Sequence, residues 1–425
     1  MATPKKDAVR MAFYFFLVTG CFGFLQPFLP LYMQAAGLDK LQIGIVLGLG
    51  AGLALLVQPL LGKLTDKLDA RKGIILGCAL VAWVAYSAFP YANSFPIFLL
   101  LTALGANGVM HLNSSGGVLI ARLAQSGAGG AHYANIRLWG SVGYIVTSLA
   151  SGWIVLQGGA AGLERQSLDR VLQGGALLFL AIACLALFLP DRRHVEEAVE
   201  GETGKAPLPL NLKWFLGAYF LYTIALYGAT GFLSLFLKDL GAQGLAITGT
   251  FAAGVLVEVF VMRWAGRFSD QFGRRPTLAL TFLLLPFRLL LYMPATGALW
   301  ILGVQSLHGL NFGIMGAVAI VFANDLATDR TRGHAQSRLF AAAGLANCLG
   351  PFLFGWVAET SGLRGMFGVA AIVAAAAALV FIFKVEESHP GSESLADRAP
   401  AWMKPMVRWL DAPGGRTNVE NRNDK

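Results

Sequence analysis

Long apolar runs alternate with short polar loops along most of this chain. Twelve runs are long enough for a membrane-spanning helix. They begin near Met11, Leu41, Gly73, Phe95, Ile136, Val171, Leu212, Leu245, Thr277, Leu299, Arg338 and Met366. A helix needs roughly 20 apolar residues to cross about 30 Å of hydrocarbon. One or two such runs would suit buried helices of a soluble protein, but twelve would not. The pattern predicts an all-α membrane protein with twelve transmembrane helices.

The composition agrees with this prediction. Of the 425 residues, 56% are hydrophobic and 13% are charged, whereas about 25% of the residues in a soluble domain are charged. The first apolar run ends at Pro27 and Pro30 rather than at small cleavage-site residues, so we expect it to stay in the mature protein. The cysteines form no CxxC or Cys/His pair, which argues against a disulfide framework or a metal site.

The placement of charge predicts the orientation in the membrane. The formal net charge is +9, which taken alone would suit a nucleic-acid partner. If both termini lie on one side, however, nearly all basic residues fall in loops on that same side. The loops on the other side hold only Lys40, Arg165, Arg170, Lys238 and Arg364. This is the positive-inside bias, so we expect both termini in the cytoplasm and no nucleic-acid partner.

Two polar stretches suggest the domain organisation. Residues 191–211 carry a run of charges and follow the sixth apolar run, so they are expected to link two bundles, 1–190 and 212–385. Residues 386–425 form a polar tail. Within the tail, 401–410 (AWMKPMVRWL) mixes apolar and basic residues, which suits either a short interfacial helix or a disordered segment.

The two halves repeat each other. Three short motifs recur in the same order and at nearly one spacing, which indicates a duplicated six-helix unit. The paired residues are Asp66 and Asp270, Asn107 and Asn311 (each 204 positions apart), and Arg137 and Arg338 (201 apart). Such repeats build transporters whose substrate site lies between the halves near the middle of the membrane.

One repeated motif is a loop of the form Gly-x-x-x-Asp followed by basic residues, at 62–72 and 266–275. A small glycine lets two helices approach closely, and the acid can hold a basic residue or the N-terminus of a neighbouring helix. A pair that forms in one orientation and breaks in the other would act as a gating latch. The candidate gating residues are Asp66, Lys67, Asp270, Arg274 and Arg275.

Several ionisable residues fall inside apolar runs. Each costs roughly 2.5–3.5 kcal/mol at a helix centre, so it tends to mark a pathway or a paired site. Glu258, Arg288 and His308 are such residues. They are candidates for a network whose proton occupancy changes with conformation, and the alternative is a static ion pair between Glu258 and Arg288. His111 is expected to be a hydrogen-bonded core histidine.

Arg137 begins the fifth predicted helix, next to Trp139. Two interpretations remain open. It is either an anchor at the inner membrane interface or a cation that reaches into a cavity and holds a carboxylate or hydroxyl groups.

The repeated loop resembles the signature loop of the major facilitator superfamily. Its second copy is nearly complete, and its first copy departs from the pattern at Asp69 and Ala70. Four further pieces, spread in order over the chain, resemble the phenylpropionate permease family and more distantly the lactose permease type of proton symporter. They are GFLQPFLPLYM (23–33), YANIRLWGSVGY (133–144), GVLVEVFVM (254–262) and VQSLHG (304–309).

The resemblance implies roles for individual residues. Glu258 matches an acid used in substrate binding, and Arg288 and His308 match members of a coupling network. Arg137 matches an arginine that grips substrate, and Tyr144 stands where a sugar-stacking aromatic lies.

Two departures from the lactose permease pattern change these expectations. Leu119 stands where an acid would pair the arginine, and Asn311 stands where the proton-carrying acid would lie. Arg137 is then free to meet an anionic substrate, and any proton carriage shifts to Glu258.

We therefore expect a secondary active transporter that carries a small organic solute by alternating access in proton symport, with an aromatic or other carboxylate favoured. The alternatives are a sugar or nucleoside symporter, and a proton-driven exporter of drugs or metabolites.

The expected substrate-binding residues are Arg137, Tyr144, Asn107, His308 and Asn311, and the expected coupling residues are Glu258, Arg288 and His308. No spacing of a catalytic triad or a metal site occurs, so neither an enzyme nor a cofactor is expected. The setting would be a bacterial inner membrane, with the protein a monomer.

Overall fold

A computed structural model describes residues 5–68, 71–123, 129–159, 162–189, 208–328 and 331–388. The regular elements in these ranges are all helices. They are α1 (Lys5–Ala35), α2 (Lys40–Leu68), α3 (Arg71–Ser87), η1 (Phe89–Tyr91), α4 (Phe95–Leu123), α5 (Gly129–Leu156), α6 (Arg165–Ala186), α7 (Leu210–Thr230), α8 (Leu233–Asp239), α9 (Gly244–Phe272), α10 (Arg274–Tyr292), α11 (Ala298–Asp325) and α12 (Arg332–Lys384). Most of the expected linker and all of the 401–410 segment lie outside the described residues.

The predicted number of membrane spans is confirmed. Within the described ranges, ten helices are long and apolar enough to cross a membrane, and the pair α7 and α8, bent by 41°, makes an eleventh span. The 53 residues of α12 are far too long for one span, and Gly362 interrupts them with a φ of +72°. Only glycine adopts such a backbone angle at little cost. The chain reverses there, so α12 supplies two spans and the total is twelve.

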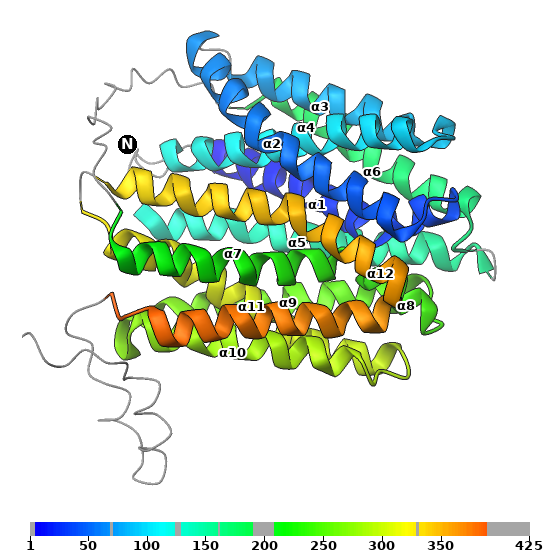
Figure 1. The fold of residues 1–425 in the computed structure, drawn as a ribbon. Helices are drawn as coiled ribbons and strands as arrows, with labels where there is room; N and C mark the ends of the chain where they lie inside the picture. Colours follow the sequence, from blue (N-terminus) through cyan, green and yellow to red (C-terminus); the bar gives the residue numbers. More distant parts are fainter. Residues whose placement is uncertain are drawn as a thin grey trace, which may run out of the picture.

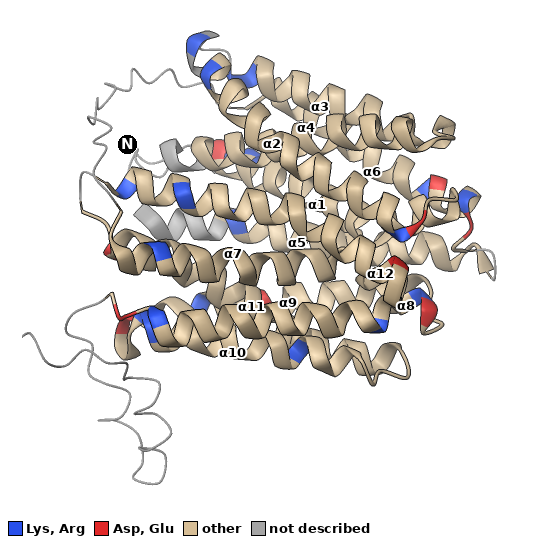
Figure 2. Ribbon diagram, viewed as in Figure 1, with Lys and Arg blue, Asp and Glu red and all other residues tan. Residues whose placement is uncertain are grey.

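The twelve spans form two bundles, α1–α6 and α7–α12. Figure 1 shows the helices of the first half (blue to teal) gathered beside those of the second half (green to red). We call the side where Lys5, Leu210 and Lys384 lie the terminal side and the opposite side the distal side. Figure 2 shows charged residues gathered towards these two sides, with few along the middle of the helices, as expected for a chain that crosses a bilayer.

A matching brace fastens each half on the distal side. In the first half, the Arg165 guanidinium donates to the carbonyl oxygens of Pro90, at 3.1 Å, and Ala92, and it lies over the Tyr32 ring at 5.7 Å. In the second half, Arg364 donates to the carbonyl oxygens of Ala295, at 2.7 Å, and Met293, and it lies over Phe236 at 5.6 Å. Each arginine thus joins the first, third and sixth spans of its half, which is independent evidence of the duplication.

The halves meet on the distal side, where helix backbones touch. A Cβ on Gly48 of α2 would lie 2.3 Å from the carbonyl oxygen of Cys348 in α12, and one on Gly44 would lie 2.3 Å from that of Pro351. A Cβ on Gly152 of α5 would lie 3.1 Å from the backbone of Gly244, at the N-terminus of α9. Glycine is required at these positions because any side chain would push the helices apart.

Polar contacts reinforce this distal closure. The Lys238 ammonium donates to Gln34 Oε1 at 2.8 Å, and the backbone N–H of Lys40 donates to Glu359 Oε2 at 2.9 Å. Towards the terminal side the halves diverge, and Figure 1 shows the ends of α2 and α12 well apart there. The structure is therefore closed between the halves on the distal side, and the ends of α2 and α12 lie apart on the terminal side.

Candidate functional site

Glu258 is the central residue of α9. At 1.5 Å per residue it lies about 21 Å from each end of this helix, which places it near the middle of the membrane. Because α9 packs against α5 of the first half, the side chain stands beside the boundary between the halves.

Three groups interact electrostatically with the Glu258 carboxylate. They are Arg137 and Tyr144 of α5 and Tyr227 of α7. Arg137 belongs to the first half, its side chain is exposed, and within the described residues no hydrogen bond or ion pair holds it. The charge that faces Glu258 is therefore an unpaired arginine of the opposite half.

Arg288 has neutral partners instead. It is 1% exposed, and it donates to Asn311 Oδ1 at 3.1 Å and to the Tyr292 hydroxyl at 3.2 Å. The Tyr292 hydroxyl donates in turn to Gln305 Oε1 at 2.7 Å. Among the described residues no ion pair joins Arg288 to Glu258, so the expected alternative of a static pair between them is wrong for this conformation.

The His308 ring lies against Gly254 of α9, one turn from Glu258, and one turn of α11 from Phe312. It is 8% exposed, yet its buried Nδ1 has no hydrogen-bond partner among the described residues. Its ring centroid lies 4.3 Å from that of Phe312. A polar nitrogen left unpaired at this depth is costly, so the site favours a ligand group that can hydrogen-bond to it.

Two aromatic residues of the site were not predicted from the sequence. Phe312 packs edge to face on Tyr227, with centroids 5.2 Å apart and planes at 85°, and Tyr227 is 38% exposed. An aromatic residue within an apolar run usually serves packing, so the sequence carries no signal that would separate these two from the other phenylalanines and tyrosines.

The two asparagines expected to bind substrate lie inside their own halves. Asn311 is fully buried, and its amide donates to the Thr281 carbonyl at 3.0 Å while its oxygen accepts from Arg288. Asn107 is 7% exposed and donates to the Ala103 carbonyl at 2.8 Å. The structure does not bring either amide together with Glu258.

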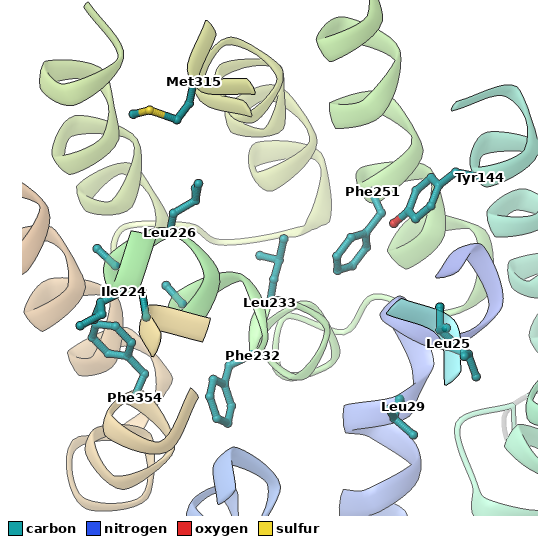
Figure 3. Packing of buried hydrophobic residues seen from close by; sticks show 14 of the residues in the cluster. Leu25, Leu29, Tyr144, Ile224, Leu226, Phe232, Leu233, Phe251, Met315 and Phe354 are labelled. Atoms are coloured by element: carbon teal, nitrogen blue, oxygen red, sulfur yellow. The ribbon is translucent and has the colours of Figure 1, made fainter. Parts of the chain in front are cut away.

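The distal end of the site is covered by a pair of rings from opposite halves. Figure 3 shows Tyr144 and Phe251 side by side, with the tyrosine hydroxyl turned towards the phenylalanine. Tyr144 is 4% and Phe251 5% exposed. Phe251 lies two turns from Glu258 on the same face of α9, so these rings stand between Glu258 and the distal side.

The candidate gating residues of the second half are held within that half. Arg274 pairs with Asp270 and with Asp325 Oδ2 at 3.3 Å, and Arg275 donates to the carbonyl oxygens of Ile382, at 2.8 Å, and Val385, at 2.6 Å. In the first half Lys67 is exposed at the end of α2, and the Asp66 side chain lies outside the described part of the structure. Two arginines thus fasten the ends of α9, α11 and α12 together.

His111 has the local role expected of a core histidine. Its Nε2 lies 3.0 Å from Ser115 Oγ, one turn further along α4, and it is 3% exposed. Nothing connects it with the groups around Glu258.

Known proteins are similar to this chain over most of its length. The MFS_1 like family matches residues 8–369. The chain is 27% identical to the maltose permease of Geobacillus stearothermophilus over 344 residues, 78% of this chain and 82% of that protein. It is 23% identical to the putative nucleoside transporter YegT of Escherichia coli (strain K12) over 419 residues, 90% of this chain and 95% of that protein.

Among solved structures, that of the nucleoside transporter NupG superposes with a TM-score of 0.72 at 18% identity, covering 88% of this chain and 98% of NupG. The family match over most of the chain and the twelve-span fold lead to one conclusion: the chain belongs to the MFS_1 like family and is a secondary transporter of the major facilitator type.

Proposed function

We propose that this transporter imports a small organic anion, an aromatic or other carboxylate, together with protons. The observation that carries the proposal is the unpaired, exposed Arg137 facing Glu258 across the boundary between the halves. A guanidinium is suited to carboxylates because it presents paired N–H donors in a fixed plane. Arg137 makes no hydrogen bond or ion pair among the described residues, so its guanidinium is a natural place for the substrate's negative charge.

The hydrogen-bonding groups near the site favour an anion over a sugar. A sugar or nucleoside would need partners for several hydroxyl groups, and an unpaired buried hydroxyl costs about 1–3 kcal/mol. Asn311 and Gln305 are occupied by Arg288 and Tyr292, so few free amide groups remain. The names of the maltose permease and nucleoside transporter relatives support a sugar or nucleoside symporter as the second candidate.

The coupling mechanism follows from the charge balance. Without substrate, Arg137 compensates the Glu258 carboxylate. An anion bound to Arg137 removes that compensation, and an uncompensated charge at this depth costs roughly 2.5–3.5 kcal/mol. A proton on Glu258 removes the cost, so the loaded site carries substrate and proton together. His308, with its free Nδ1, is proposed to share this proton or to contact the substrate.

Other residues are proposed to act indirectly. Asn311 acts through Arg288, whose charge it helps to satisfy, and Asn107 ties α4 to its own half. Tyr144 contributes its hydroxyl beside Glu258 and covers the site on the distal side.

The distribution of basic residues supports placing the terminal side in the cytoplasm of a bacterial cell, with the protein in the inner membrane. The distal contacts would then close the outside, and the structure would be inward-facing. Alternating access rocks the two halves about the site. The site lies within one chain, so a monomer is sufficient for transport.

The test is Glu258→Gln in proteoliposomes, with radiolabelled phenylacetate as the probe. We expect the variant to lose accumulation driven by a pH gradient while it retains exchange of labelled for unlabelled phenylacetate. Accumulation at the wild-type rate would overturn the coupling assignment. Accumulation in energised everted vesicles would instead support the exporter.

A further inference from the structure

Tyr227 and Phe312 form an aromatic surface beside Glu258 that the proposed coupling chemistry does not use. The two rings come from different helices, α7 and α11, and contact each other edge to face. Phe312 is supported from behind by the His308 ring at 4.3 Å. The three rings therefore form one aromatic cluster, in which the Tyr227 and Phe312 planes stand nearly perpendicular to each other.

Helix packing places this surface beside Glu258. A Cβ on Gly309 of α11 would lie 2.6 Å from the backbone nitrogen of Glu258, and Phe312 follows within one turn of α11. The Tyr227 hydroxyl interacts electrostatically with Glu258 of α9, which lies towards the first half. Tyr227 remains 38% exposed, and its hydroxyl has no hydrogen-bond partner among the described residues. A tyrosine used only for packing would normally bury its ring and pair its hydroxyl.

The surface also lies where a transmembrane helix is interrupted. Tyr227 is one turn before the break between α7 and α8, across which the axis bends by 41°. The exposed ring and the helix break thus lie within about one turn of each other on the seventh span.

We propose that Tyr227 and Phe312 are specificity-determining residues, which stack against a flat apolar ring of the substrate while its anionic group binds Arg137. This inference rests on the proposed function and names the substrate class more closely: a ring-bearing monoanion. Flat rings gain from offset or edge-to-face contact with aromatic side chains, and a linear or puckered molecule of equal charge gains less.

Two carboxylates of equal charge and similar size test this, namely phenylacetate and cyclohexylacetate. Binding is measured by isothermal titration calorimetry on the full chain in detergent, with maltose as a third ligand. We expect the wild type to prefer phenylacetate.

Phe312→Leu should weaken phenylacetate binding three- to ten-fold, which corresponds to the free energy of one aromatic pair. It should leave the affinity for cyclohexylacetate within two-fold. Tyr227→Leu should act in the same way, and Tyr227→Phe should retain the preference.

The matched control is Phe287→Leu, the same substitution on α10 at a ring that is 55% exposed. It should change neither affinity. If both carboxylates bind the wild type equally, or if Phe312→Leu weakens both equally, the aromatic surface is not a specificity element, and the proposed anion transport still stands. If the wild type binds maltose and neither carboxylate, the proposed function fails, and this inference fails with it.

Discussion

Gln34 and Lys238 occupy equivalent positions in the two halves, 204 residues apart, and they contact each other through a hydrogen bond of 2.8 Å. Equivalent residues of a duplicated unit meet only on the pseudo-two-fold axis that relates the copies. The contact therefore locates this axis on the distal side, where the ends of α1 and α8 come together. It must break before the distal side opens.

The close approach of α2 and α12 makes a first prediction. In Gly48→Leu the new side chain would collide with the Cys348 carbonyl, since even a Cβ would lie 2.3 Å from it. The distal side should then fail to close, and transport should fall at least ten-fold. Spin labels on Tyr91→Cys and Leu299→Cys, in a chain without native cysteines, should report a longer distance.

Gly77→Leu provides the control, because a Cβ at Gly77 meets nothing within 4 Å. It should keep both transport and the label distance. An unchanged distance in Gly48→Leu would show that the contact does not limit closure.

A second prediction concerns Arg137. Arg137→Gln removes a charge-assisted contact worth about 1.5–3 kcal/mol, so the affinity for phenylacetate should fall roughly ten- to hundred-fold. No hydrogen bond or ion pair among the described residues depends on Arg137, and Glu258 can take up a proton when the arginine's charge is lost. The unfolding free energy should therefore change by less than about 0.5 kcal/mol. Calorimetry and thermal unfolding separate the two effects. Arg338→Gln is the matched control and should leave affinity unchanged.

The buried Arg288 gives a third prediction. Asn311→Leu removes the acceptor at 3.1 Å from its guanidinium and leaves a buried charge short of a partner, which should cost about 3 kcal/mol. Asn107→Leu removes the equivalent neutral amide, and it should cost about 1 kcal/mol. Thermal unfolding in detergent should rank the variants in this order, and the reverse order would show that Asn311 is not needed to satisfy Arg288.

The distal braces give a fourth prediction. Arg165→Ala and Arg364→Ala each remove hydrogen bonds to two loop carbonyls and a cation–π contact. Each should destabilise the protein by about 1–3 kcal/mol. Because they lie in different halves, their effects should add within about 0.5 kcal/mol. A double variant much less stable than this sum would show that the halves unfold as one unit.

The sequence was sufficient to predict the spans, because the length of an apolar run alone decides whether it crosses a bilayer. It also singled out Glu258, whose charge stands out within such a run. It did not predict that Glu258 faces Arg137 rather than Arg288, because this depends on how α5 and α9 of different halves pack. Tyr227 and Phe312 were missed because aromatic residues are common in every span. Nor did the break between α7 and α8 have a signal, since no proline marks it.

That break divides the seventh span into two parts that contact different halves of the protein. The long segment α7 packs along α12 of its own half, whereas the seven-residue α8 holds the first half through Lys238. An unbroken helix would have to move as one piece when the distal side opens. The backbone departs from helical angles at Phe232, with φ −105° and ψ 3°. We expect α8 to leave the first half before the two bundles move, so that opening crosses two small free-energy barriers rather than one large barrier.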